Sequence, residues 1–281
     1  MSVTETLVHR TPDSAAIRVS DTARAFDAVA PEYHASNEAN PILRHMRARV
    51  MSVLNRHVQS GARVLDLGCG PGTDHLALMR AGYEVTALDA SPEMAREASR
   101  RSAAMPWENK PTVLCHPIER LNELRLEPFD AAFSNFGPLN CVSDLAYVAS
   151  QIYGALKPGG VLVASVIGRL CPFEVAMYLT RGDLARAFVR LRDDQVGIPL
   201  GDGTVWTRYL TPRRFVRTFR PAGFKPRALQ GLGVIAPPPY ASAFAARHPE
   251  IVGRLLEWDA SVGRWPLFRD LGDHFLVVMQ R

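Results

Sequence analysis

The stretch VLDLGCGPG at residues 64–72 constrains the fold of this chain more than any other part of the sequence. Apolar residues flank Asp66, and glycine then recurs at every second position, as Gly68, Gly70 and Gly72. A glycine has no Cβ, so it adopts positive φ angles and lets a backbone or a ligand come close. Glycines at this spacing indicate that something other than side chains fills the space above the turn.

The segment from residue 62 to residue 167 alternates between strand and helix patterns. Ser91 suits the N-cap of one of these helices, with Pro92 in its first turn. Alternation of this kind implies a parallel sheet that helices cover on both faces. Strands are predicted at 62–67, 83–89, 111–116, 129–135 and 160–167, and helices at 73–81, 91–102 and 143–156.

The pattern changes on both sides of this segment. Before it, helices are predicted at 21–36 and 41–58; after it, residues 168–222 read as mostly helical, with one helix opening at Thr211. The end of the chain predicts a strand at 224–234, a helix at 241–260 and a strand at 274–281, and leaves open whether these two strands run antiparallel. We interpret the chain as an N-terminal helical arm or lid at 1–60 and one α/β domain at 61–281, with 168–222 as a helical insertion over the substrate.

Composition indicates an ordinary soluble protein, with 47% hydrophobic and 22% charged residues. The opening stretch MSVTETLVHRTPDSAA lacks the apolar core of a signal peptide, and the longest apolar run, 161–167, is too short to cross a bilayer. The four cysteines are scattered without a C-x-x-C pair, which argues against a zinc site and a disulfide framework. A cytoplasmic location without a membrane partner is therefore expected.

The sequence pI of about 9.2 raises the question of a nucleic-acid partner. The densest basic stretch is 181–227, where arginines lie along a mostly helical region. This pattern favours a solvated helix face over a track for phosphates. An RNA methyltransferase, for tRNA or rRNA, that uses the 181–227 face stays open as an alternative.

A dinucleotide is the first ligand to test against the glycine stretch. The dinucleotide-binding fingerprint needs G-x-G-x-x-G, but its third glycine position here is Thr73, and the glycine falls one residue early, at Gly72. Asp66 at the strand end would also place a negative charge against a pyrophosphate. The arrangement suits a ligand with an ammonium group better than NAD.

The pattern D-x-G-x-G-x-G after a strand resembles the first motif of the class I S-adenosylmethionine-dependent methyltransferases. The resemblance extends from about residue 24 to residue 280 and is closest to the small-molecule branch that includes the ubiquinone and menaquinone C-methylases. It implies a Rossmann-like, doubly wound, mostly parallel seven-stranded sheet and S-adenosylmethionine as cofactor. A purely structural glycine-rich turn, or a regulatory protein that binds the cofactor without transfer activity, are the alternatives.

The resemblance also assigns roles to individual residues. Asp66 would face the methionyl ammonium, and Gly68 and Gly70 would let the cofactor lie on the backbone. Asp89 would accept hydrogen bonds from the ribose hydroxyls, unless it only begins a turn. Arg44 from the arm would reach the methionyl carboxylate, or it would be only a solvated helix residue. The other expected cofactor neighbours are Cys69 and Gly72 in the loop, Ala90, Met94, Pro117, Ile118 and Glu119 around the adenine, Asn135 and Phe136 beside the methionine, and Tyr33 from the arm.

The segment after the fourth predicted strand is informative through what it lacks. Enzymes of this family that methylate a nucleobase amino group carry an N-P-P-Y-like element, whereas this chain has Asn-Phe-Gly-Pro at 135–138. The metal-dependent catechol type carries an acid where this chain has Asn135. A divalent metal is therefore not expected.

The acceptor side is less well defined by the sequence. A sulfonium makes the methyl group electrophilic, so a general base is needed only for a protonated, weakly acidic acceptor. The candidates are His34, His116, Glu174, Tyr178 and His274. Phe136, Phe173, Met177 and Tyr178, with Trp206 and Tyr209 in the insertion, predict a small, largely apolar acceptor; which atom is methylated and the oligomeric state are not indicated.

Overall fold

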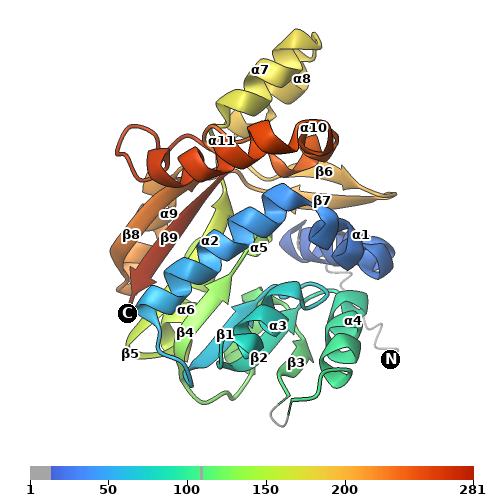
Figure 1. Cartoon of the computed structure of the whole chain (residues 1–281). Helices are drawn as coiled ribbons and strands as arrows, with labels where there is room; N and C mark the ends of the chain where they lie inside the picture. The colour runs from blue at the N-terminus through green and yellow to red at the C-terminus, as the bar shows by residue number, and fades with distance from the viewer. Residues whose placement is uncertain (1–13, 108–109) are drawn as a thin grey trace, which may run out of the picture.

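The computed structural model of the chain describes residues 14–107 and 110–281. Residues 1–13 and 108–109 lie outside the described residues. The first of these ranges holds most of the stretch that is expected to lack a signal-peptide core. The centre of the structure is a seven-stranded sheet in the order β3-β2-β1-β4-β5-β9-β8 (Figure 1). The strands are β1 (Arg63–Leu67), β2 (Glu84–Asp89), β3 (Thr112–Cys115), β4 (Phe129–Ser134), β5 (Leu156–Ile167), β8 (Lys225–Leu232) and β9 (His274–Gln280). The first five are parallel, and β9 is antiparallel to both β5 and β8, so the Rossmann-like, mostly parallel α/β fold is confirmed.

Helices cover both faces of this sheet, because successive strand residues point to opposite sides. Along β4, Phe133 belongs to one apolar cluster and the adjacent Ala132 to the other. The first cluster includes residues of α2 (Pro41–His57), α3 (Thr73–Arg80), α4 (Pro92–Ala103), α10 (Ser242–Arg247) and α11 (Pro249–Val262). The second includes residues of α5 (Pro138–Cys141), α6 (Leu145–Ala155) and α9 (Pro212–Phe219).

Local signals explain where several helices begin. The Ser91 hydroxyl accepts a hydrogen bond from Met94 N at the start of α4, which confirms Ser91 as the N-cap. Thr211 accepts one from Arg214 N at the start of α9, where Pro212 occupies the first turn. The strand-to-helix connections therefore leave the sheet at defined residues.

The order of the strands fixes where a ligand can bind. β1 lies between β2 and β4, so the direction in which the chain adds strands reverses at β1. In open parallel sheets the crevice at such a point lies outside the carboxyl ends of the strands. The glycine loop at residues 68–72 follows the carboxyl end of β1 and therefore lies at this crevice.

The insertion at 168–222 contains a β-hairpin, so the prediction of a mostly helical insertion is wrong in this part. α7 (Pro172–Thr180) and α8 (Leu184–Ala187) project from the top of the molecule in Figure 1, followed by the short η2 (Val189–Leu191) and then by β6 (Val196–Leu200) and β7 (Gly203–Thr207). The hairpin packs on α1 (Ser14–Ala39), where Trp206 N donates to Thr22 Oγ1 at 3.1 Å. Glycines around Asp202 between alternating apolar residues are the turn signal that the helical interpretation overlooked.

The single helix predicted at 241–260 is also interrupted. The chain forms η4 (Pro239–Ala241), then α10, and begins α11 at Pro249 after the non-helical His248. A proline lacks the backbone N–H and restricts the residue before it, so a helix cannot continue smoothly through this point.

Candidate active site

The three glycines of the loop after β1 differ in what surrounds them. Gly68, Gly70 and Gly72 have φ angles of +77°, +54° and +84°. An added Cβ on Gly68 would lie 2.4 Å from the Cβ of Pro138, and one on Gly72 would lie 2.4 Å from the His75 ring. A Cβ on Gly70 would meet nothing within 4 Å. The loop is thus packed against protein at its two ends and open at Gly70, where a ligand can lie on the backbone.

Asp89 borders this opening at the end of β2. One of its carboxylate oxygens accepts a hydrogen bond from Gly70 N at 2.8 Å, and the other accepts one from Ser91 N at 2.9 Å. Burial raises the pKa of Asp89 to about 6, although the two backbone donors lower it. Each carboxylate oxygen has a further lone pair, so Asp89 can accept additional hydrogen bonds from a ligand.

Asp66 holds an acidic oxygen without a partner. The residue is 1% exposed, and its Oδ2 is buried without a hydrogen bond. Burial, followed by the charges of Asp74 and Asp89, raises the pKa of Asp66 well above its usual value. Because buried polar atoms are nearly always hydrogen-bonded, this oxygen fits a ligand that brings a positively charged donor.

Arg47 in α2 holds a second unsatisfied group, of opposite charge. Its Nε donates to Asp74 Oδ1 at 2.8 Å, but its Nη1 is buried without a hydrogen bond, 3.9 Å from the carboxylate of Glu38. Arg44, the arginine expected here, is exposed on the same helix. This exposure agrees with the alternative that Arg44 is a solvated helix residue, whereas Arg47 lies on the helix face that Met46 and Val50 bury.

Phe136, which follows β4, contacts both Arg47 and His274. Its φ of +59° is a strained value for a bulky residue, and such strain clusters at functional sites. The Ser165 hydroxyl accepts from Phe136 N at 2.8 Å and lies 2.6 Å from Asn135 Oδ1, which holds this turn in place. The Arg47 guanidinium lies 5.2 Å from the Phe136 ring centroid, and the His274 ring meets the same ring edge-on at 5.7 Å.

The arm helix α1 contacts the starts of α3 and α4. Asp27 Oδ1 lies 2.5 Å from the Ser91 hydroxyl at the start of α4, and His34 Nδ1 lies 2.9 Å from Thr73 Oγ1 at the start of α3. Tyr33, half-buried in the same helix, has its pKa raised by burial. The arm thus reaches both helices that leave the cofactor edge of the sheet.

The other expected cofactor neighbours lie along the same edge. Met94, Ile118 and Cys69 are buried. Burial raises the pKa of Glu119, and His116 Nε2 lies 2.8 Å from the carbonyl oxygen of Arg120 within its own loop. The structure therefore brings together the segments after β1, β2, β3 and β4, which also hold Ala90, Pro117 and Asn135.

A buried ionic cluster, made of Glu174, Arg190, Asp273 and His274, joins the insertion to the start of β9. Arg190 donates to Glu174 at 2.8 and 2.5 Å and to Asp273 Oδ1 at 2.7 Å, and His274 Nδ1 lies 2.9 Å from Asp273 Oδ2. The Tyr240 hydroxyl donates to Glu174 at 2.7 Å. Two of the base candidates, Glu174 and His274, thus share one network.

The aromatic and apolar residues of the insertion are less enclosed. Phe173, Met177 and Tyr178 on α7 are half-buried, as is Trp206 in the hairpin. Tyr209 is buried, with the Arg190 guanidinium 5.1 Å from its ring centroid. Their contact with a substrate stays a prediction.

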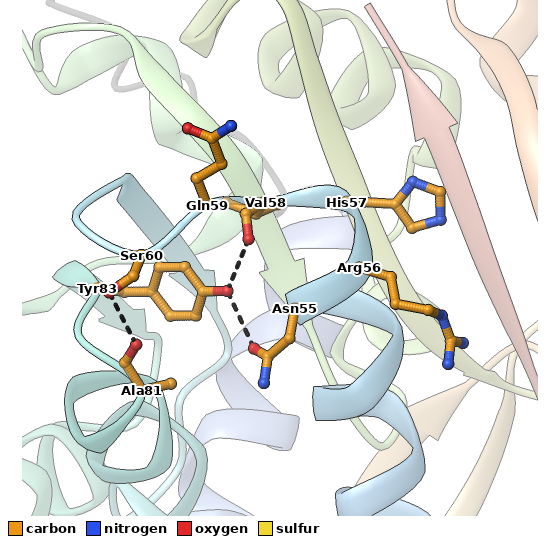
Figure 2. A pocket seen from close by; sticks show the side chains of 8 residues that line it. All are labelled: Asn55, Arg56, His57, Val58, Gln59, Ser60, Ala81 and Tyr83. Atoms are coloured by element: carbon orange, nitrogen blue, oxygen red, sulfur yellow. Dashed lines mark hydrogen bonds between the residues drawn. The ribbon is translucent and has the colours of Figure 1, made fainter.

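A hollow at the other end of the sheet holds none of the expected site residues. Figure 2 shows its lining from the end of α2 and the turn before β2. The Tyr83 hydroxyl donates to Asn55 Oδ1 at 3.0 Å and to the Val58 carbonyl at 3.1 Å. These bonds join α2 to the start of β2, so they serve the fold.

Within residues 14–107 and 110–281, no group of three or more histidine, cysteine or acidic side chains is arranged to hold a metal ion. No helix in this part of the chain is long and apolar enough to span a membrane.

Comparison with known proteins identifies relatives of the chain. A family model for a methyltransferase domain matches residues 64–160. The malonyl-[acyl-carrier protein] O-methyltransferase of Enterobacter lignolyticus is 35% identical over 150 residues, which cover 52% of this chain and 53% of that protein. The chain therefore spans about half the length of this relative. The protein of the same name from Salmonella typhimurium is 28% identical over 92% of this chain and 96% of its own length.

Among solved structures, the 1,6-didemethyltoxoflavin-N1-methyltransferase of Burkholderia thailandensis is similar in fold. It superimposes with a TM-score of 0.58 at 17% identity and covers 98% of this chain and 93% of that one. That structure contains S-adenosylhomocysteine and 1,6-didemethyltoxoflavin. The likeness extends over the sheet and the arm.

Sequence reasoning overlooked Arg47 and Asp74, which the structure joins by an ion pair at the first turn of α3. Arg47 interrupts the apolar stripe formed by Leu43, Val50 and Leu54 at helical spacing, and a charge on such a stripe was the available signal. No local sequence pattern indicates Arg190 and Asp273, the other two members of the ionic cluster.

Proposed function

We propose that this chain, a member of the class I S-adenosylmethionine-dependent methyltransferases, transfers the methyl group of S-adenosylmethionine to a small, largely apolar molecule without a metal ion. The domain match spans the glycine loop, Asp89 and the turn at Phe136. The relatives are named for methyl transfer to malonyl-[acyl-carrier protein] and to 1,6-didemethyltoxoflavin. These names support a small acceptor group.

One observation carries the proposal: an acidic and a basic side chain, both next to Asp74, each hold a buried atom without a hydrogen-bond partner. Asp66 Oδ2 and Arg47 Nη1 both lack hydrogen-bond partners, and both residues neighbour Asp74. The methionine end of the cofactor carries one ammonium and one carboxylate. Asp66 would accept from the ammonium, and Arg47 would donate to the carboxylate.

The remaining cofactor contacts follow the sheet edge. Asp89 would accept from the ribose hydroxyls with the lone pairs that Gly70 N and Ser91 N leave free. Met94 and Ile118 would pack against the adenine, and Glu119 would lie at its edge. Tyr33 would cover the bound cofactor from the docked arm.

The sulfonium supplies an electrophilic methyl group when the cofactor is bound. The residues of the chain align the acceptor with that methyl group and exclude water. Phe136, held by Ser165, would form one wall of the acceptor site, and Phe173, Met177 and Tyr178 would supply apolar surface from the insertion.

The structure offers no support for an RNA track along 181–227. Arg190 is buried in the ionic cluster, Arg214 lies 3.4 Å from Asp193, and Arg186 lies 3.4 Å from Asp183. A row of free cations, which phosphate binding needs, is thus interrupted. Neither the RNA alternative nor the regulatory one is favoured by a specific observation.

Calorimetry with S-adenosylhomocysteine tests the proposal at its first step. We expect binding with 1:1 stoichiometry and no heat with NADH. The purified protein is then incubated with S-adenosylmethionine and apolar phenols, naphthohydroquinones or a malonyl thioester, and methylated product is detected by mass spectrometry. A protein that binds NADH and ignores S-adenosylhomocysteine would contradict the proposal.

A further inference from the structure

The ionic cluster leaves one nitrogen of His274 without a partner. Asp273 Oδ2 lies 2.9 Å from Nδ1, so a proton on Nδ1 is hydrogen-bonded and Nε2 of the neutral ring is an acceptor. No residue of the described chain forms a hydrogen bond with Nε2, and this atom is not among the fully enclosed polar atoms without partners. The nitrogen is thus free to accept a proton from a bound molecule.

The ionic cluster places two acids and one arginine around His274. Arg190 pairs with both Glu174 and Asp273, and Asp273 also pairs with His274. Burial opposes ionisation of Asp273, but His274 and Arg190 hold its pKa below the usual value. The other titratable groups facing the cluster, Tyr209, Tyr240 and Cys171, have pKa values raised by burial and are neutral near pH 7.

The position of His274 places it beside Phe136, the proposed wall of the acceptor site. His274 begins β9 and pairs with Ile167 at the end of β5 and with Leu232 at the end of β8. Its ring contacts Phe136, the same ring that the Arg47 guanidinium contacts. The imidazole and the proposed methionine-binding arginine are therefore one side chain apart.

A purely structural role explains only part of this arrangement. Arg190 also donates to the carbonyl oxygens of Gly168 and Asp273, at 3.0 and 3.1 Å, so Arg190 with Glu174 is sufficient to anchor the insertion to β9. A histidine is not needed for that anchor. The orientation of its ring by a fixed carboxylate is the arrangement that enzymes use for a proton acceptor.

We propose that His274 is the general base of the methyl transfer, that Asp273 is a positioning residue for its ring, and that the acceptor carries a weakly acidic O–H or N–H group. This inference rests on the proposed function and narrows its acceptor. A malonyl carboxylate is already ionised near pH 7 and needs no base, whereas a phenol does.

The step balances without a further reactant. The acceptor gives its proton to His274 Nε2, and the freed electron pair forms a bond to the methyl carbon. The bond between that carbon and sulfur breaks, and its electron pair stays on the sulfur of S-adenosylhomocysteine. His274 then releases the proton to water.

Two substitutions and a matched control test the assignment. His274→Gln removes the base and keeps the volume, Asp273→Asn loosens the ring orientation, and His57→Gln changes a histidine at the far hollow of Figure 2. The probes are catechol, a naphthalene-1,4-diol and malonyl-N-acetylcysteamine. For each variant, the Kd for S-adenosylhomocysteine, kcat and the pH profile of kcat are measured.

We expect wild type to methylate at least one hydroxyl probe and His274→Gln to lower its kcat by about 10²- to 10⁴-fold. The Kd for S-adenosylhomocysteine should stay within about twofold, and the loss should shrink above the pKa of the hydroxyl, where no base is needed. Asp273→Asn should lower kcat less, and His57→Gln should match wild type.

The failures of the two proposals are distinguishable. A wild-type protein without affinity for S-adenosylhomocysteine contradicts the proposed function and, with it, the base. A wild-type protein that binds S-adenosylhomocysteine but methylates only the malonyl probe, or none of the three, contradicts the base alone. The same holds if His274→Gln keeps the kcat and pH profile of wild type.

Discussion

The cofactor edge and the ionic cluster both bury charged side chains, but they treat these charges differently. At the cofactor edge, Asp66 Oδ2 and Arg47 Nη1 have no hydrogen-bond partners. In the cluster, Glu174 and Asp273 are both bonded to Arg190. A buried polar atom without a hydrogen bond is costly, so we infer that a ligand completes these two atoms, whereas the bonded carboxylates of the cluster hold the insertion to β9.

The largest expected effect that tests this comparison is on the free energy of unfolding. Glu174→Ala would leave Arg190 with one carboxylate and Tyr240 without its acceptor, and we expect the free energy of unfolding to fall by about 3–5 kcal/mol. Urea unfolding measures this loss. The matched control, Glu123→Ala, breaks an exposed pair with Arg120 and should leave the free energy of unfolding nearly unchanged. Equal losses for the two variants would show that the cluster does not stabilise the fold.

A second prediction separates two glycines of one loop. Gly68→Ala should lower the free energy of unfolding by about 2–4 kcal/mol, because its Cβ would overlap Pro138 in addition to the strain of a positive φ. Gly70→Ala has only the strain, about 1–2 kcal/mol, since its Cβ meets open space.

The Gly70→Ala substitution should also weaken ligand binding. The Cβ of Gly70→Ala would enter the ligand space, so we expect an affinity for S-adenosylhomocysteine at least about tenfold weaker than wild type by calorimetry. A Gly70→Ala protein that binds with wild-type affinity would show that the ligand does not lie on this backbone.

A third, smaller effect is on pH dependence. The pKa of Asp89 is about 6, above the ordinary value of 3.8, so the unliganded protein binds this proton more tightly when folded and loses stability as the pH rises from 4 to 6. Acceptance from ribose hydroxyls needs the ionised carboxylate, so affinity for S-adenosylhomocysteine should fall below pH 6, by up to about tenfold per unit.

Asp66 also titrates above its usual pH, so the contribution of Asp89 has to be isolated. Asp89→Asn should bind more weakly at pH 7.5 and should remove part of the slope between pH 5 and pH 6.5. An unchanged slope in calorimetric titrations at several pH values would exclude Asp89 from ribose binding.

Removal of metal ions is expected to have no effect. Treatment with EDTA should leave affinity for S-adenosylhomocysteine and turnover of any accepted probe unchanged. Loss of turnover with recovery on adding magnesium would show that a metal ion takes part.

The sequence predicts that Gly68, Gly70 and Asp89 lie at one edge of the sheet, because these residues are close to one another in the chain. Gly68 and Gly70 follow their strand directly, and Asp89 ends the next strand, so one short pattern carries them. The sequence did not indicate that Arg47 is buried and Arg44 exposed, because the rotational phase of α2 depends on packing against the sheet. Residue spacing alone does not determine that phase.

The ionic cluster could not be predicted in the same way. Glu174, Arg190 and Asp273 come from α7, η2 and the residue before β9, and no local pattern joins segments so distant in the chain. His274 was a candidate only as a histidine beside a strand. Its oriented ring becomes visible only when β9 is placed between β5 and β8.

The most direct test of the claim that the unsatisfied charges receive the cofactor compares two ligands on one variant. S-adenosylhomocysteine carries the ammonium and carboxylate, and 5′-methylthioadenosine lacks both. We expect Arg47→Gln to weaken binding of S-adenosylhomocysteine by about 30- to 150-fold, or 2–3 kcal/mol, and to leave 5′-methylthioadenosine within about twofold of wild type. Arg44→Gln, the matched control, should change neither Kd. Equal weakening of both ligands by Arg47→Gln, or a loss with Arg44→Gln instead, would contradict the claim.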